Sequence, residues 1–207
     1  MNILDVKDNE IDVPKTNLEI LQGIFNRQRE LHEKYSTIEE RNGIGLAIVK
    51  DIPFNLDNPK WQYIIKDYAW RVTEEITEAL EAYQEKNIPH TIEELIDALH
   101  FFTEVLLICG ITHEDINDRV LSSEENNILY PIYPVYHLGL ACNLLKNKPW
   151  KNTHVPTDKN RFKVHMINGY NCLLEVILTT FLDTLADVYM IYFKKSLVNS
   201  FRIRSNY

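Results

Sequence analysis

Four acidic side chains in the first half of the chain are spaced so that together they could hold metal ions. Glu75 and Glu78 are three residues apart, and further along so are Glu94 and Asp97. Three residues of α-helix turn the chain through roughly 300°, so each pair would project from one side of its helix. Four converging carboxylates repel one another, and divalent cations relieve that repulsion. With oxygen ligands alone, Mg²⁺ or Mn²⁺ is the expected ion.

The residues around the second acidic pair strengthen this interpretation. Glu94 and Asp97 lie in the mostly apolar run EELIDALHFFTEVLL, so they sit on or beside a stripe that faces a core. The alternative is an ordinary acidic surface in a chain with 30 Asp and Glu residues, where Glu94 serves only to cap its helix. On spacing alone, both interpretations stay open.

The end of the chain is basic. Lys194, Lys195, Arg202 and Arg204 occur within the last fourteen residues, and no acidic residue accompanies them. A helix with Lys and Arg on one side and an amide such as Asn199 between them can hold phosphate oxygens. The alternative is a solvated basic tail.

The order of the two acidic pairs resembles the all-α NTP pyrophosphatase superfamily, which includes MazG-like proteins and the dimeric dUTPases. The pattern is E-x-x-E, then fifteen residues, then E-x-x-D. The phrase from Glu94 to Phe101 is similar to the second metal motif of the dimeric dUTPases and of the T-even phage dCTP/dUTP pyrophosphatases. The resemblance implies an all-α bundle whose acids hold Mg²⁺, for which Mn²⁺ can substitute, and it implies that Glu75 takes a proton from water. The implied ligands are Glu75, Glu78, Glu94 and Asp97.

The C-terminus carries a second resemblance, to the late motif K-N-x-x-N-x-x-R-Q-x-x-G-Y of the dimeric dUTPases. Ser196, Ile203 and Asn206 replace the Asn, Gln and Gly of that motif, and Ile203 cannot form the hydrogen bonds of a Gln. Dimeric dUTPases also place a Gln of their first helix against the pyrimidine, which makes Gln28 a candidate reader of the base, with a surface amide as the alternative. The motif implies four further substrate-binding residues: Lys195, Asn199, Arg202 and Tyr207.

Together, these resemblances imply an enzyme that hydrolyses a pyrimidine deoxyribonucleoside triphosphate to the monophosphate and pyrophosphate. dUTP is the first choice of substrate and dCTP the second, and the family implies a homodimer. If the chain is phage-encoded, it would act in the host cytoplasm. Two alternatives remain: a non-catalytic nucleotide-binding or regulatory protein on the same bundle, and a house-cleaning NTP pyrophosphatase of broad specificity.

Composition and charge argue against a protein that binds nucleic acid. The chain has 207 residues, of which 45% are hydrophobic, and its formal net charge is −8. An acidic chain is a poor candidate for binding a nucleic-acid backbone. Residues 1–100 carry 20 acids and 11 bases, whereas residues 101–207 carry 10 and 11. This asymmetry suits an anionic ligand that meets metal ions on the acidic side, although an acidic surface alone would also explain it.

Cysteine usage and hydropathy indicate the compartment. Three widely spaced cysteines exclude a disulfide scaffold. The N-terminus lacks a signal pattern, and the most apolar stretch, residues 98–111, is too short to span a bilayer. We therefore expect a cytoplasmic protein with no membrane partner.

The elements that must position these residues have a period near 3.6, which predicts an all-α helical bundle. Asn58 and Pro59 are suited to begin one helix, and Thr91 with Glu94 forms a capping box that would begin the next. His100 is expected to be a hydrogen-bonded core residue beside the site. Residues 111–169 have no counterpart in the family, so we expect an insertion within a single domain, 1–207. The expected helices cover 17–35, 59–86, 91–109, 136–146 and 160–204, the last with a break between 182 and 185.

Overall fold

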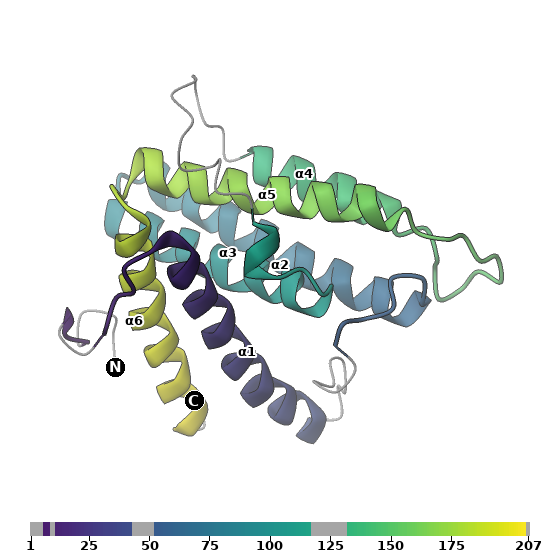
Figure 1. The fold of residues 1–207 in the computed structure, drawn as a ribbon, viewed down its shortest axis with the longest axis horizontal. Helices are drawn as coiled ribbons and strands as arrows, with labels where there is room; N and C mark the ends of the chain where they lie inside the picture. The colour runs from purple at the N-terminus through teal and green to yellow at the C-terminus, as the bar shows by residue number, and fades with distance from the viewer. Residues whose placement is uncertain (1–5, 9–10, 43–51, 117–131, 206–207) are drawn as a thin grey trace.

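The computed structural model describes residues 6–8, 11–42, 52–116 and 132–205 (Figure 1). Within these ranges all regular structure is helical, which confirms the expected all-α fold class. The elements are α1 (Asn17–Arg41), α2 (Pro59–Gln84), α3 (Ile88–Ile108), the short 3₁₀ helix η4 (His113–Asp115), α4 (Ile132–Leu144), α5 (Lys159–Thr180) and α6 (Leu185–Arg204).

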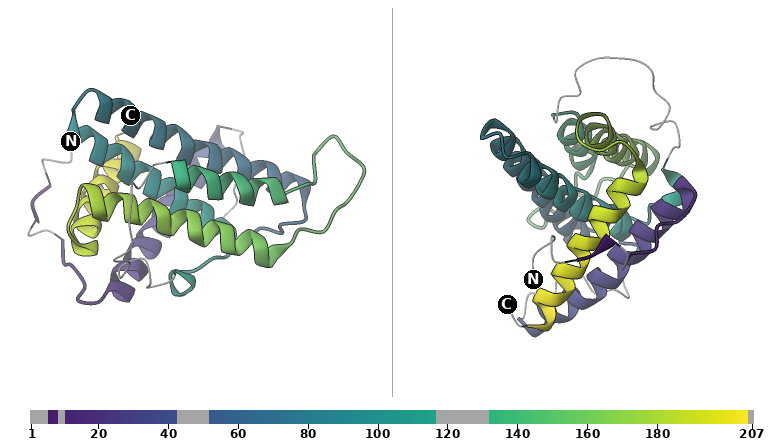
Figure 2. Two further views of the ribbon diagram at one scale, coloured as in Figure 1. Left: turned by 90° about the horizontal axis from the view of Figure 1, so that it is seen from above. Right: turned by 90° about the vertical axis from the view of Figure 1, so that its left-hand side faces the viewer.

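Helix α3 is the centre of the bundle. It packs against α2 in an antiparallel hairpin and also contacts α1, α5 and α6. Helices α4 and α5 form a second pair beside this hairpin, and α1 and α6 lie side by side as they extend away from those four helices (Figures 1 and 2). Fourteen of the 21 residues of α3 are buried. A helix that is buried on nearly all sides must find partners inside the protein for its polar side chains.

The turn between α2 and α3 is fixed by backbone hydrogen bonds. Lys86 adopts a left-handed conformation with a φ of 61°, and its N–H donates to the Tyr83 carbonyl at 3.0 Å. The N–H of Asn87 donates to the Ala82 carbonyl at 2.9 Å, which completes the Schellman pattern that ends many helices. The two helices therefore reverse direction within three residues, and this brings their acidic pairs to the same end of the hairpin.

Helix α3 begins three residues earlier than we expected. Its N-cap is Asn87, whose side chain accepts a hydrogen bond from the His90 N–H at 3.4 Å, so the predicted capping box of Thr91 and Glu94 is wrong. Pro89 is tolerated because the first N–H groups of a helix have no partner within it. This start leaves the Glu94 carboxylate available for other contacts.

The other helix bounds follow the predictions with two differences. Helix α1 continues to Arg41 instead of ending near Tyr35, and neither Gly nor Pro occurs between Tyr35 and Gly43. Helix α4 begins at Ile132, four residues before the predicted start. The predicted start of α2, with Asn58 accepting from the Lys60 N–H at 2.9 Å, is confirmed.

The segment 111–169 contributes to the central core where the structure describes it. Phe162 and Met166 of α5 are 1% and 0% exposed and belong to the same apolar cluster as Phe102 of α3. A Cβ at Gly169 would lie 2.9 Å from the Phe102 ring, so this glycine allows α5 to approach α3 closely. The segment is thus packed into the bundle, and its origin as an insertion in a single 1–207 domain stays a prediction.

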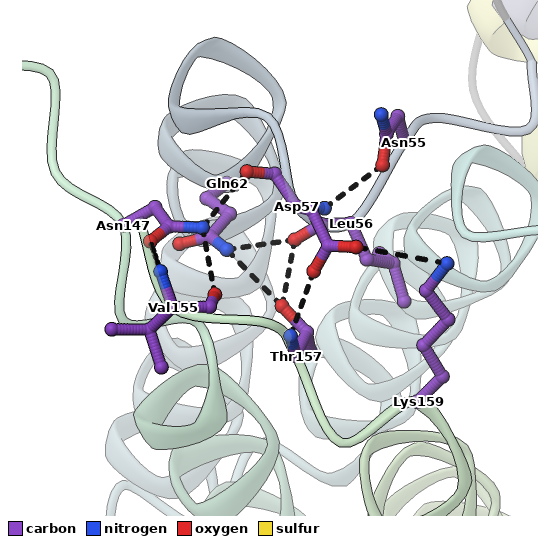
Figure 3. Close-up of polar contacts among 8 residues, drawn as sticks. All are labelled: Asn55, Leu56, Asp57, Gln62, Asn147, Val155, Thr157 and Lys159. Atoms are coloured by element: carbon purple, nitrogen blue, oxygen red, sulfur yellow. Dashed lines mark hydrogen bonds and ion pairs between the residues drawn. The ribbon is translucent and has the colours of Figure 1, made fainter. Parts of the chain in front are cut away.

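Polar contacts fasten the connection between α4 and α5 to the start of α2 (Figure 3). Asn147 Nδ2 donates to the carbonyls of Asp57, at 2.8 Å, and Val155, at 3.0 Å. The Thr157 N–H donates to the Asp57 carboxylate at 2.7 Å, and the Thr157 hydroxyl donates to the Leu56 carbonyl at 2.9 Å. The backbone hydrogen bond from Thr157 is the main reason that the pKa of Asp57 is lowered. These bonds keep the α4–α5 pair in register with the hairpin.

Among the described residues, no single helix is both long enough and apolar enough to cross a membrane. Helices α5 and α6 meet that criterion only when taken together, and they are bent by 104° at the break between them.

Candidate metal centre and adjacent pocket

Three of the four aligned acids converge across the α2–α3 hairpin. One carboxylate oxygen from each of Glu75, Glu78 and Glu94 lies within 4.8 Å of the other two. Glu78 is exposed, Glu75 is half-buried, and Glu94 is 8% exposed. The arrangement arises because the two pairs lie at similar distances from the turn at residues 85–87. It offers an oxygen-only set of ligands that opens to solvent on the Glu78 side.

The electrostatics of this cluster favour a cation. Burial raises the pKa of Glu75 to about 8, and a hydrogen bond with Glu94 and the charges of the neighbouring carboxylates contribute to the shift. At neutral pH, Glu75 therefore holds a proton that partly relieves the repulsion. His90 Nδ1 lies 3.1 Å from Glu94 Oε1, but its side chain is 47% exposed. Three crowded carboxylates with no buried cation among them fit Mg²⁺ or Mn²⁺.

The fourth acid, Asp97, has a different partner. Its Oδ2 lies 2.6 Å from Lys195 Nζ, which is also 2.6 Å from Glu93 Oε1. Burial raises the pKa of Asp97 to about 6, although Lys195 opposes that shift. Burial alone would lower the pKa of Lys195, but Asp97 and Glu93 together raise it, so the lysine stays protonated. The structure thus places Lys195, predicted from its motif to bind phosphate, on a carboxylate predicted to bind metal.

A pocket of about 200 Å³ opens beside Asp97. Side chains from α1, α2, α3 and α6 line it, which explains why no single stretch of sequence reveals it. Two of the predicted substrate residues, Gln28 and Asn199, are among them. The full lining is Gln28, Leu31, Tyr35, Tyr68, Arg71, Asp97, His100, Phe101, Glu104 and Asn199.

Arg71 is a residue of this pocket that our reading of the sequence missed. Its guanidinium carbon lies 4.7 Å from the Tyr68 ring centroid and 5.9 Å from that of Phe101, and its Nη2 pairs with Asp67 at 3.1 Å. A signal was present, since Arg71 precedes Glu75 by one helical turn and so shares its side of α2. The lining of the pocket therefore includes a cation and aromatic rings as well as acids.

The floor of the pocket is a buried hydrogen-bond network around Gln28, which is 3% exposed. Gln28 Nε2 donates to Glu104 at 2.6 Å, and Gln28 Oε1 accepts from the Tyr192 hydroxyl at 2.7 Å. His100 Nδ1 lies 2.8 Å from the same Oε1, so Nδ1 carries the hydrogen. Glu104 also pairs with His32 Nδ1 at 2.6 Å. The prediction that His100 is a hydrogen-bonded core residue is confirmed, whereas Glu104 and His32 were not singled out from the sequence.

Most of the hydrogen-bonding capacity of the Gln28 amide is used within the protein. Its oxygen already accepts two hydrogen bonds, and one N–H of its amide donates to Glu104, which leaves the second N–H for a ligand. Gln28 is therefore not the surface amide of the alternative interpretation. That Gln28 binds the pyrimidine base stays a prediction.

The remaining predicted substrate residues follow α6. Lys195, Asn199 and Arg202 are spaced by four and three residues, so they lie along one side of the helix. Arg202 is exposed in the last turn, near enough to Tyr35 in the pocket wall to lower its pKa, although burial raises that pKa overall. Tyr207 lies outside the described residues. Asp97 and Asn199 thus line the pocket, and Arg202 lies near Tyr35 in its wall.

Neither a protein-family model, nor a curated protein, nor a solved structure matches this chain. The case for a function therefore rests on the residues of this chain and on their geometry.

Proposed function

We propose that this protein is a Mg²⁺-dependent hydrolase that cleaves a pyrimidine deoxyribonucleoside triphosphate to the monophosphate and pyrophosphate. The observation that carries the proposal is the convergence of Glu75, Glu78 and Glu94 within 4.8 Å, beside a pocket that Asp97 lines. An acidic metal centre next to a small pocket suits a substrate that combines a polyanionic chain with one heterocycle.

The size of the pocket is compatible with a pyrimidine base. A protein cavity of about 150 Å³ is large enough to hold benzene. The volume here is about 200 Å³, which accommodates a single six-membered ring with its substituents. Phe101 and Tyr68 supply aromatic walls, and Gln28 has one N–H left to donate to a carbonyl oxygen of the base. Both dUTP and dCTP carry such an oxygen.

The residues of the chain have separate tasks in this proposal. Bound at the three glutamates, Mg²⁺ or Mn²⁺ would supply activation of water and offset the charge of the triphosphate. Glu75 would lose its own proton when the ion binds, and its carboxylate would then be free to take the proton from the attacking water. Arg202 and Tyr207 hold phosphate oxygens, and Asn199 faces the sugar or the base.

Lys195 can assist with the phosphates from its present position. An ammonium group has three N–H donors, and the contacts with Asp97 and Glu93 use two of them. The third remains for a phosphate oxygen.

The experiment that tests the proposal is a panel of deoxyribonucleoside triphosphates incubated with Mg²⁺ and assayed for pyrophosphate. We expect cleavage of dUTP or dCTP, and loss of most turnover in Glu78→Gln because one charged ligand is gone. Glu81→Gln, at an exposed position one turn further along α2, is the matched control and keeps the wild-type rate. A Glu78→Gln variant as active as the wild type would overturn the metal assignment.

The same panel separates the two alternatives. Cleavage of purine and pyrimidine nucleotides at similar rates would favour the house-cleaning pyrophosphatase, and nucleotide binding without cleavage would favour a regulatory protein. The homodimer is part of the proposal, and sedimentation equilibrium of the purified chain tests it.

A further inference from the structure

Beside the cluster of Glu75, Glu78 and Glu94, α6 supplies a buried cation, Lys195. Lys195 Nζ lies 2.6 Å from both Asp97 Oδ2 and Glu93 Oε1, two carboxylates of α3, and the lysine side chain is only 6% exposed. An exposed lysine would exchange its partners with water. This one is held between two carboxylates and has little freedom to leave them.

The position of Lys195 bears on how many divalent ions the centre can hold. Asp97 is the one of the four aligned acids whose oxygens do not join the cluster of three glutamates. A second divalent ion at Asp97 would lie beside a fixed ammonium, and two like charges repel strongly in a partly buried site. The ion would also compete with Lys195 for the oxygen atoms of Asp97.

We propose that Lys195 takes the place of a second divalent ion, so that the protein without nucleotide binds a single one, at Glu75, Glu78 and Glu94. The inference rests on the proposed function, because it requires the glutamate cluster to bind a divalent ion. In this arrangement Asp97 and Glu93 hold the ammonium in place. Their ion pairs also fix α6 against α3, one helical turn before Asn199 reaches the pocket.

Titration with Mn²⁺ in the absence of nucleotide tests the inference, with free Mn²⁺ measured by electron paramagnetic resonance. We expect one tight site in the wild type and two in Lys195→Met, because loss of the ammonium frees Asp97 and Glu93 to bind an ion. Lys195→Arg keeps the charge and keeps one site. Lys194→Met removes the neighbouring charge of α6, which pairs with Asp8, and serves as the matched control with one site.

A second variant keeps the test decisive if Lys195→Met fails to fold by circular dichroism. Asp97→Asn in the otherwise wild-type chain leaves one tight Mn²⁺ site if the ion is held by the three glutamates, and loses it if Asp97 is a ligand. Two sites in the wild type, or one site in both the wild type and a folded Lys195→Met, would overturn the role of Lys195. No tight site in the wild type would instead overturn the proposed function.

Discussion

Glu94 and Glu104 are two buried glutamates of the same helix. Both lie on α3, ten residues apart, and they are 8% and 4% exposed. The fold treats them differently. Glu104 accepts a hydrogen bond from Gln28 Nε2 and contacts His32 Nδ1, each at 2.6 Å. Glu94 faces Glu75 and Glu78 instead, and its nearest basic partner is the half-exposed His90.

This difference teaches how to separate a structural acid from a binding one. A buried carboxylate is costly unless the protein supplies donors or a cation, and Glu104 has two polar partners, Gln28 Nε2 and His32 Nδ1. Around Glu94 the neighbours are further carboxylates, and a proton on Glu75 is the substitute for a cation. The cluster of Glu75, Glu78 and Glu94 is therefore where we propose that an ion from solvent binds.

The largest expected effect is the loss of stability on substitution of Glu104, whose carboxylate has partners within the protein. Glu104→Gln leaves an NH₂ group facing one of two donors and breaks the buried pair with His32, so we expect a loss of about 3–5 kcal/mol in the free energy of unfolding. Urea unfolding measures this loss, and Glu114→Gln at an exposed position is the control. A loss below about 1 kcal/mol would mean that the two glutamates do not differ as described.

For Glu94, in the glutamate cluster, we expect metal binding to weaken and stability to be kept. Glu94→Gln removes a ligand and weakens Mn²⁺ binding at least tenfold, which corresponds to about 1.4 kcal/mol. The same change relieves repulsion among carboxylates, so the metal-free protein keeps or gains stability. Calorimetric titration and urea unfolding give the two values, and Glu104→Gln is the comparison for both. Unchanged Mn²⁺ affinity in Glu94→Gln would contradict the assignment of the cluster.

His100, in the hydrogen-bond network at the floor of the pocket, makes the stability of the protein depend on pH. Burial lowers the pKa of His100 from 6.5 to about 3, so the folded protein leaves this ring neutral in mild acid, while the unfolded chain protonates it. The contribution of His100 to the free energy of unfolding is complete at a pH above the pKa that this histidine has in the unfolded chain. It falls as the pH drops below that pKa, by up to about 1.4 kcal/mol per pH unit. His100→Asn removes that contribution. Unfolding free energies across the acid range would then show a shallower slope, and an unchanged slope would argue against a neutral His100.

The smallest effect belongs to Glu75, which is only half-buried, so that water screens part of its interactions. Its pKa is raised from 4.5 to about 8, so the folded protein keeps a proton that the unfolded chain has released. Stability of the metal-free protein therefore declines as the pH rises through this interval. Mn²⁺ affinity increases over the same interval because the ion displaces the proton. Glu75→Gln removes the decline, and an equal slope in this variant would count against the raised pKa.

Local sequence was sufficient for the helical class and for most helix bounds. The period near 3.6, Asn58 before Pro59, and the break before Leu185 are properties of short segments, and the structure has each of them. The start of α3 was predicted wrongly because two caps competed, Asn87 and Thr91. A capping motif read from sequence does not show which of two starts the surrounding packing selects.

For the site, the sequence by itself determined that Glu75 and Glu78 share one helix face and that Lys195, Asn199 and Arg202 share another, because helical geometry fixes neighbours three and four residues apart. Only the tertiary structure decided which faces meet. It brought Glu94 to the first pair, gave Asp97 to Lys195 across 98 residues of sequence, and built the pocket from four helices. Such contacts depend on how whole helices pack around α3, and packing is set by the summed burial of many side chains and not by any local motif.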